Sequence, residues 1–293
     1  MKTMQSEEQN NWLTASVFMS MEDWTLMLSQ FISPWVGKNV DDGNIFSFQI
    51  EFNHNGGDNI RVCVLTKKER AFEVSQNLAQ NAHNFFEKFK KKEIFKPLPP
   101  NGIFMPFPQN CIKYGLFQLY LNTDESHEYS ITKKVGELIL QVFNEEQADA
   151  GSIFLFALFL QMAFANELIN IDTSQAGFIT SVFDNEINMY SENLNDLKEK
   201  FENIQDSIPE IFEEIKIVKK QLNIANEDHY WLYEWILFCS LKLATESIDV
   251  DMRAQIYQNY RNQFMLINSL LGLDIKDRLL LSYSLRHFFH QFF

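Results

Sequence analysis

The chain is poor in the residues that mark disulfide scaffolds and fibrous proteins. Among its 293 residues are only three cysteines, ten glycines and seven prolines. The cysteines are odd in number and widely spaced, which excludes a disulfide framework and a zinc motif and fits a reducing compartment. We therefore expect a cytoplasmic protein. So little glycine and proline also excludes collagen-like and low-complexity chains.

Positive charge is scarce as well. The chain has 25 Lys and Arg against 39 Asp and Glu, a formal net charge of −14. Binding to a phosphate backbone requires a basic footprint, so we expect no nucleic-acid partner. The short basic run Lys88–Lys92 is interpreted as a solvated helix face. The acidic balance would instead suit a basic peptide or protein.

Long hydrophobic runs are also missing. The strongest candidate, Ser152–Ala165, is shorter than the roughly twenty residues that span a bilayer, and Gln161 interrupts it. It predicts a buried core helix, and we expect no membrane association. The first residues, MKTMQSEEQNN, are polar and have no apolar core of the kind found in signal peptides.

The common signatures of nucleotide binding and hydrolysis are absent. The chain contains no GxGxxG or GxxxxGK[ST] motif, and no HExxH or GxSxG motif. His287 and His290 are three residues apart near the end of the chain, but no acidic third ligand lies nearby in sequence. The sequence therefore predicts neither a metal site nor a cofactor.

What the chain does contain is a clear hairpin over Ile45–Leu65, IFSFQIEFNHNGGDNIRVCVL. Apolar residues occupy every second position of its first half, which places them on one face of a strand. The pair Gly56-Gly57 lies in an Asn- and Asp-rich connector and supplies positive φ at low steric cost, so the chain reverses here. On the returning strand Arg61 stands among apolar neighbours. It either points into water or binds an anion.

The order of elements predicts an α+β fold. Strands are predicted only before residue 130, including one over Leu116–Leu121, and a first helix covers Met19–Trp35. From there to the end the periodicity is helical. We expect residues 1–129 to hold a small, mostly antiparallel sheet with flanking helices. Residues 130–293 would form a helical part packed on it as one integrated domain.

The order of the segments supports a family resemblance. NNWLTASVFMSMEDWTLMLSQFISPWV leads into a strand ending in IEFN, a glycine-containing turn and DNIRVCVL. A proline-rich interval, KYGLFQLYLNTDES and a helical remainder follow. Over nearly its whole length the chain resembles the thiopeptide-type bacteriocin biosynthesis domain, also known as the C-terminal elimination domain of class I lantibiotic dehydratases.

The resemblance implies work on a ribosomally synthesised, post-translationally modified peptide by a freestanding protein. Elimination domains expel glutamate from glutamylated Ser or Thr, leaving dehydroamino acids. This lyase-type step needs a base for the Cα proton and cations for the glutamate carboxylates. A related branch, the pyridine synthases, joins two dehydroalanines on the same scaffold.

Several family positions can be matched residue by residue. Arg61 stands where the family has the first of two strand arginines, and Cys63 replaces the second. Lys113 replaces the Arg that precedes Tyr114-Gly115, and Asn110 replaces a Glu three positions earlier. The resemblance thus implies catalytic roles for Arg61 and Lys113. Arg61, Asn110 and Tyr114 would bind the substrate.

The last predicted helix departs from the family as well. Leu281–Arg286 falls where the family has its histidine-containing motif, so that catalytic His is absent. Tyr283 and His287 are close by, and we expect one of them to move the proton. Arg61 and Lys113 would line a shared cavity at the sheet, with Tyr283 or His287 facing them.

The lost family residues leave other functions open. The protein would be a non-catalytic partner that binds the precursor peptide, a larger dehydratase or a glutamylation protein. It would alternatively be a cycloaddition enzyme like the pyridine synthases, or an unrelated helical interaction protein. The long helical stretch after Ser174 leaves a homodimer open.

Overall fold

The chain is an α+β protein, as predicted. The computed structural model describes residues 10–89, 107–116, 127–171, 176–189, 194–220, 230–245 and 253–292. Its contacts divide the chain into two compact units, residues 1–149 and 150–293. The sequence had grouped every residue after 129 with the helical part. The structure instead keeps helix α4 (His127–Val142) in the first unit, because α4 packs on strand β2.

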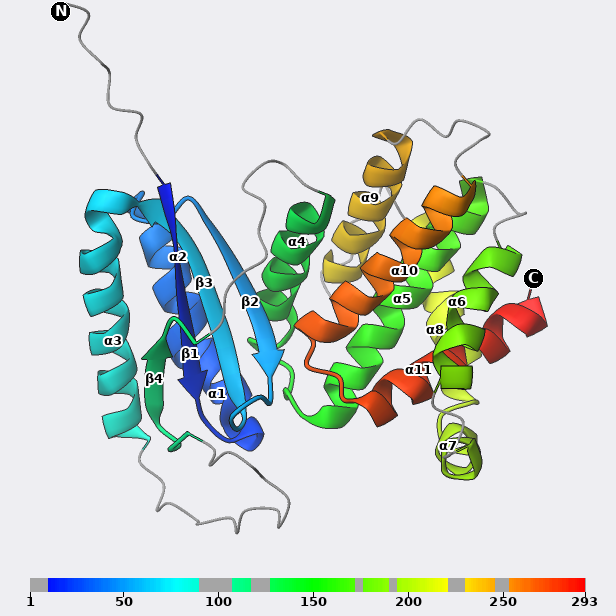
Figure 1. Ribbon diagram of the computed structural model, residues 1–293, viewed down its shortest axis with the longest axis horizontal. Coiled ribbons are helices and arrows are strands. Elements are labelled where there is room, and N and C mark those ends of the chain that lie inside the picture. Colours follow the sequence, from blue (N-terminus) through cyan, green and yellow to red (C-terminus); the bar gives the residue numbers. More distant parts are fainter. Residues whose placement is uncertain are drawn as a thin grey trace, which may run out of the picture. The chain divides into compact units, whose positions relative to one another are not determined.

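The first unit is built on a four-stranded sheet (Figure 1). Its strands are β1 (Asn10–Phe18), β2 (Ser47–Asn53), β3 (Asn59–Lys67) and β4 (Cys111–Tyr114). The strand order is β2-β3-β1-β4, and every neighbouring pair is antiparallel. The predicted hairpin is therefore confirmed. Of the strand predicted at 116–121, only Leu116 lies among the described residues.

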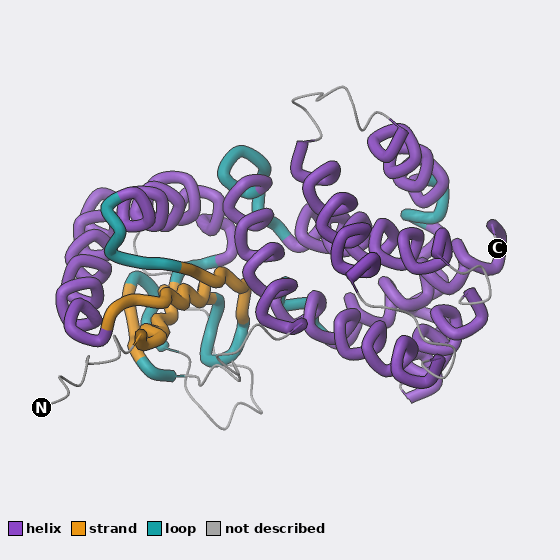
Figure 2. Tube along the Cα trace, turned by 90° about the horizontal axis from the view of Figure 1, so that it is seen from above, coloured by secondary structure: helices purple, strands orange, loops and turns teal. Residues whose placement is uncertain are grey.

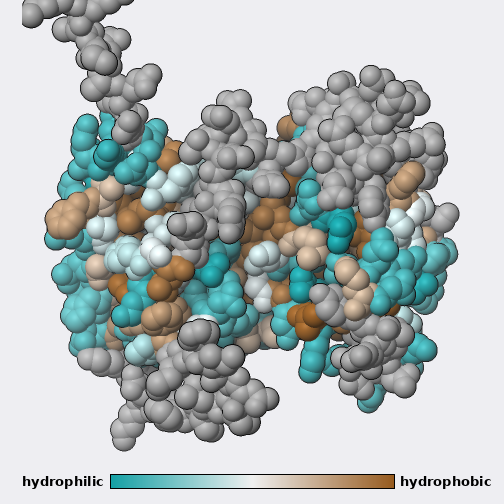
Figure 3. Space-filling view, in the orientation of Figure 1, coloured by the Kyte–Doolittle hydropathy of each residue, from teal (hydrophilic) through white to brown (hydrophobic). Residues whose placement is uncertain are grey.

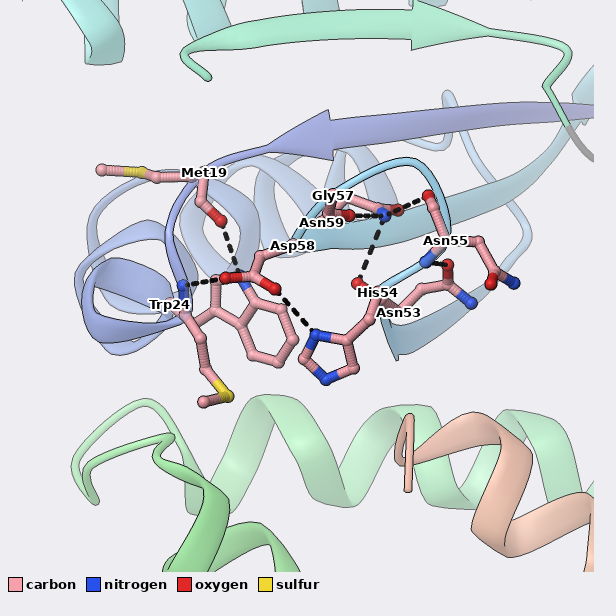
Figure 4. Close-up of polar contacts among 9 residues, drawn as sticks. Met19, Trp24, Asn53, His54, Asn55, Gly57, Asp58 and Asn59 are labelled. Carbon is pink, nitrogen blue, oxygen red and sulfur yellow. Dashed lines mark hydrogen bonds and ion pairs between the residues drawn. The ribbon is translucent and has the colours of Figure 1, made fainter. Parts of the chain in front are cut away.

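The turn of this hairpin is fixed by one side chain. Gly56 and Gly57 take positive φ values of 76° and 113°, as the sequence indicated. The side-chain nitrogen of Asn59 lies 3.2, 3.3 and 2.7 Å from the carbonyl oxygens of Asn53, Asn55 and Gly57, so its two N–H groups are shared among three acceptors (Figure 4). A single carboxamide thus holds three carbonyls of the turn together.

A second set of contacts joins the turn to the helix that follows β1. The carboxylate of Asp58 lies 2.8 Å from Nδ1 of His54 and accepts a hydrogen bond from the backbone N–H of Met21. The indole of Trp24 stacks on the His54 ring with centroids 5.3 Å apart, and its Nε1 donates to the carbonyl of Met19 (Figure 4). The turn is therefore anchored as well as closed.

A continuous helical run covers one face of the sheet and lies behind it in Figure 1. It contains α1 (Trp24–Met27), a π-helical segment (Leu28–Ile32) and α2 (Ser33–Asp41). The predicted helix over Met19–Trp35 therefore exists but continues to Asp41. Pro34 does not end the run: it lies in the first turn of α2, directly after the π-helical segment, and the helix continues beyond it.

Helix α3 (Ala71–Lys88) packs beside β4 and against the π-helical segment. Its buried positions recur at helical spacing: Val74, Leu78, Ala82, Phe85 and Phe86. The opposite side is largely hydrophilic where α3 is seen at the left of Figure 3. An amphipathic pattern of this kind orients the helix with one face on the core.

Helix α4 approaches the edge strand β2 very closely. A Cβ added at Gly136 would lie 2.8 Å from the backbone nitrogen of Ile50. The Tyr129 hydroxyl lies 2.7 Å from the hydroxyl of Ser47 on β2. Glycine is therefore required at position 136 for the helix to reach the strand.

The second unit is helical throughout its described residues, and all the strands shown in orange in Figure 2 belong to the first. Its helices are α5 (Ala150–Ile171), α6 (Ala176–Met189), α7 (Leu194–Glu202), α8 (Ser207–Lys220), α9 (Tyr230–Thr245), α10 (Arg253–Leu270) and α11 (Ile275–Phe292). Residues Ala150–Asn170 of α5 are long and apolar enough to cross a membrane, but 83% of that stretch is buried. This is the environment expected of a core helix.

Candidate functional site

One row of side chains crosses all four strands of the sheet. Arg61 on β3 is directly opposite Glu51 on β2 and Ser16 on β1, and Ser16 is opposite Lys113 on β4. Directly opposed residues of antiparallel strands point to the same face. Glu51, Arg61, Ser16 and Lys113 therefore form one line, which we call the polar row. The predicted residues Arg61 and Lys113 are brought onto one face, with Ser16 between them.

Arg61 is ion-paired. Its Nη1 lies 3.0 Å from Oε1 of Glu51, and the two side chains are only 20% and 14% exposed. Burial raises the pKa of Glu51, and the neighbouring guanidinium of Arg61 opposes that rise. Neither sequence interpretation of Arg61, a solvated arginine or an open anion site, describes this pair. A carboxylate ligand would have to compete with Glu51.

The next row on the same face carries a buried carboxamide. Gln49 on β2 is opposite Cys63 on β3, and Gln49 is only 2% exposed. Among the residues that the structure describes, neither its side-chain nitrogen nor its oxygen has a hydrogen-bond partner. Leaving such a group unpaired costs about 1–3 kcal/mol, so an unpartnered buried amide on this face indicates a place for a polar ligand.

Cys63 stands where the family resemblance would place a second arginine. Its side chain is buried, and burial raises the pKa of the thiol well above its ordinary value. The group on this face is therefore a neutral thiol and not a cation. The departure from the family pattern changes the charge of the face as well as its shape.

The other predicted residues of β4 have separate roles. Asn110 takes a left-handed φ of 59°, and its N–H donates to the carbonyl of Phe18, which starts the pairing of β4 with β1. Lys113 is exposed and makes no ion pair or hydrogen bond with a described residue. Tyr114 points to the opposite face, where its hydroxyl donates to the carbonyl of Ser75 at 2.7 Å. Burial raises the pKa of Tyr114 to about 12, so the hydroxyl remains protonated.

Tyr283 and His287 lie together on α11 in the second unit. Both rings contact Phe201 of α7, with centroid distances of 5.0 Å for Tyr283 and 4.8 Å for His287. His287 Nε2 also lies 2.7 Å from the side-chain nitrogen of Gln291. The predicted helical face is therefore present. The cavity that these two residues would share with Arg61 and Lys113 stays a prediction.

Sequence reasoning missed Glu51, Ser16 and Gln49. The signal for Glu51 was present, because a hairpin in which Asn53 pairs with Asn59 places Glu51 opposite Arg61. No comparable signal identified Ser16, since the pairing of β1 with β3 is not local in sequence. Within the described residues, no group of three His, Cys, Asp or Glu side chains could hold a metal ion.

Comparison with known proteins bears on the fold. No protein-family model and no curated protein sequence matches the chain. A solved structure titled pyridine synthase TbtD from thiomuracin biosynthesis superposes with a TM-score of 0.70 at 13% identity. That match covers 94% of this chain and 96% of TbtD.

A second solved structure, TsrL, superposes with a TM-score of 0.61 at 11% identity, covering 97% of this chain and 95% of TsrL. Both matches extend over nearly all of each chain, so the likeness concerns the complete architecture. The fold implied by the family resemblance is therefore confirmed, and the chain has the fold of the pyridine synthase TbtD.

Proposed function

We propose that the protein acts in the maturation of a ribosomally synthesised, modified peptide and binds that peptide along the polar row. The observation that carries the proposal is the unpartnered, buried carboxamide of Gln49 beside the Glu51–Arg61 pair. A carboxamide offers both donors and an acceptor, the complement of a peptide group. The shared fold with TbtD, named as a pyridine synthase, supports the same class of substrate.

The charge of the row favours uncharged residues in the substrate. Expelling glutamate would require cations facing its carboxylates. Arg61 is already neutralised by Glu51, and position 63 holds a neutral thiol, which leaves Lys113 as the other cation of the row. We therefore favour pyridine-synthase-like joining of two dehydroalanines over glutamate elimination. Arg61 and Lys113 would hold peptide carbonyls of the reacting segment.

The experiment compares two synthetic precursor peptides by mass spectrometry after incubation with the purified protein. One carries a glutamylated Ser and the other carries two dehydroalanines. We expect conversion of the dehydroalanine peptide, with ring formation and release of the leader segment, and no loss of glutamate from the first. Glutamate loss would reverse the assignment of chemistry, and no binding of either peptide would overturn the proposal.

Amino-acid substitutions test whether the polar row is needed for conversion of the peptide. Arg61→Ala should abolish conversion, whereas Lys133→Ala, which removes an exposed cation from α4 in the same unit, should not. Tyr283→Phe and His287→Ala test separately the proton transfer that the sequence assigned to these residues. Full activity of Arg61→Ala would contradict a role for the row.

One observation favours a second function. The buried neutral thiol of Cys63, in place of a family arginine, suits a protein that binds the precursor without converting it. In that case both peptides would bind to the protein and emerge with unchanged mass. Recovery of a larger dehydratase or a glutamylation protein with the bound peptide would then identify its partner.

A further inference from the structure

A groove of about 300 Å³ lies between helix α3 and the part of the helical run formed by the π-helical segment and α2, all in the first unit. These helices pack on the apolar side of the sheet, so the groove does not belong to the polar row. Its lining combines four aromatic rings, four carboxamides and two lysines around Pro34. None of the described residues that line the groove is acidic.

The floor of the groove is aromatic and already ordered. Phe31, Trp35 and Phe85 are all at least 95% buried. The rings of Phe31 and Phe85 stack with centroids 5.7 Å apart, and the Trp35 indole donates a hydrogen bond to Oδ1 of Asn77 at 2.7 Å. The rings are therefore held in place by packing, and a small fraction of each is open to a ligand.

The helix that forms one wall is irregular at the groove. Gln30 and Phe31 come from the π-helical segment Leu28–Ile32, between α1 and α2. Such single π-helical turns occur frequently at functional sites. Here the segment brings an exposed carboxamide and a buried ring to the same wall.

The other wall carries a ladder of exposed carboxamides. Asn77, Asn81 and Asn84 follow one another at helical spacing along α3. From the first to the last the helix rises about 10.5 Å, the length of about three extended peptide residues. The side-chain nitrogen of Asn81 donates to the backbone carbonyl and to Oδ1 of Asn77, and Oδ1 of Asn84 accepts from Gln80. One acceptor, Asn81 Oδ1, and one donor, Asn84 Nδ2, are therefore left without a partner among the described residues. Peptide groups of an extended chain could pair with them in turn.

The groove is also locally positive in a chain of net charge −14. Lys38 of α2 and Lys88 of α3 stand on its two walls, and both are exposed. Neither ammonium group makes an ion pair or a hydrogen bond with a described residue. Lys88 begins the basic run that the sequence suggested was a solvated helix face. Because Lys88 lies opposite Lys38, it can also be interpreted as one of two cations that bind carboxylates of a ligand.

We propose that this groove binds an extended, acidic segment of the peptide that the protein processes. The carboxamide ladder would pair with the backbone, the aromatic floor would receive an apolar side chain, and the two lysines would pair with flanking carboxylates. This inference rests on the function proposed above. It assigns the charged part of the peptide to the groove and the uncharged, reacting part to the polar row.

The test measures binding by fluorescence polarisation. The probe is a fluorescein-labelled peptide in which Glu alternates with Phe or Leu, and its control has Gln in place of each Glu. The full-length protein should bind the Glu peptide more tightly than the Gln peptide. Lys38→Glu with Lys88→Glu should weaken binding about tenfold, because two attractive charge pairs become repulsive. Asn81→Ala with Asn84→Ala should also weaken it.

The matched control is Lys198→Glu with Lys200→Glu, the same charge change at two exposed positions of α7. It should leave binding unchanged. Equal effects of the two double variants, or no preference for the Glu peptide, would overturn the proposal. Conversion of a precursor without any acidic segment should be insensitive to the Lys38 and Lys88 changes. If the wild-type protein does not convert that precursor, the result contradicts the proposed function and leaves the groove proposal unaffected.

Discussion

The two faces of the sheet differ in the side chains that they bury near Arg61: one buries apolar groups, and the other buries polar groups as well. On the apolar face Ile50 and Phe52 are fully buried against the helical run. On the polar face Gln49 and Ser16 are 2% exposed, next to the Glu51–Arg61 pair. Burying apolar surface stabilises the fold, whereas burying unpaired polar groups costs stability. The comparison suggests that the polar face is maintained for binding and the apolar face for stability.

The largest effect should come from the apolar face. Phe52 stacks on Trp24 with centroids 4.8 Å apart and contacts Phe143 edge-on at 5.3 Å. Phe52→Ala should lower the free energy of unfolding by about 3–5 kcal/mol, measured by urea denaturation. Phe52→Leu should cost about 1 kcal/mol, since most of the volume is retained. If Phe52→Ala has nearly normal stability, the apolar face does not stabilise the fold as we conclude.

The edge of the sheet should be the next most sensitive. Gly136→Ala would place a methyl group 2.8 Å from the backbone of β2, so the helix must move away. We expect a loss of about 1–3 kcal/mol in the free energy of unfolding. Gly177→Ala on α6 is the control, because nothing lies within 4 Å of its Cβ position. That change should be neutral or stabilising by up to about 1 kcal/mol.

On the polar face, breaking the ion pair should make stability more dependent on pH. The pKa of Glu51 is raised in the folded protein by burial, so folding already favours its protonated form and stability falls as the pH rises above 4.5. Arg61→Met removes the group that opposes this rise. The fall should become steeper and reach higher pH, with a loss of about 1–2 kcal/mol at neutral pH.

Denaturation at a series of pH values measures this effect. Combining Arg61→Met with Glu51→Gln should remove the contribution of this position to the pH dependence, because no buried carboxyl group then remains there. A steep profile in the double variant would show that another group titrates.

The smallest change in stability, and the sharpest separation of the two faces, should come from Gln49→Leu. Both polar atoms of Gln49 lack partners in the part of the chain that the structure describes, so an apolar side chain of similar size should be neutral or stabilise the fold by up to about 1 kcal/mol. Peptide binding should nevertheless weaken. A variant that is more stable yet binds less would show that this carboxamide serves a ligand. Unchanged binding would remove Gln49 from the site.

Much of the first unit could be predicted because its signals are local. The alternation of Phe46 to Phe52 and the Gly-Gly turn determine the hairpin, and the hairpin register brings Glu51 to Arg61. The helix past Trp35 was missed because Pro34 looks like a helix end in sequence but occupies a first turn. Close approach of α4 to β2 depends on Gly136, which carries no signal of its partner strand.

The candidate site was harder to predict than the fold. Arg61 and Lys113 were identified by family pattern, but the pattern could not show that Arg61 is paired or that Tyr114 points to the other face. Both facts depend on strand register and on the alternation of side chains across a strand. The groove was missed entirely, because its two walls are separated in sequence and each looks like an ordinary amphipathic helix.

The turn between β2 and β3 has a consequence for how the protein folds. The side chain of Asn59 contacts three backbone carbonyls within seven consecutive residues. The turn can therefore form before strands that are distant in sequence pair with the hairpin. β1 and β4 are far from the hairpin in sequence, and closing long loops to reach them is slower. The hairpin should therefore be the template on which the rest of the sheet assembles, with early protection of its amides from hydrogen exchange.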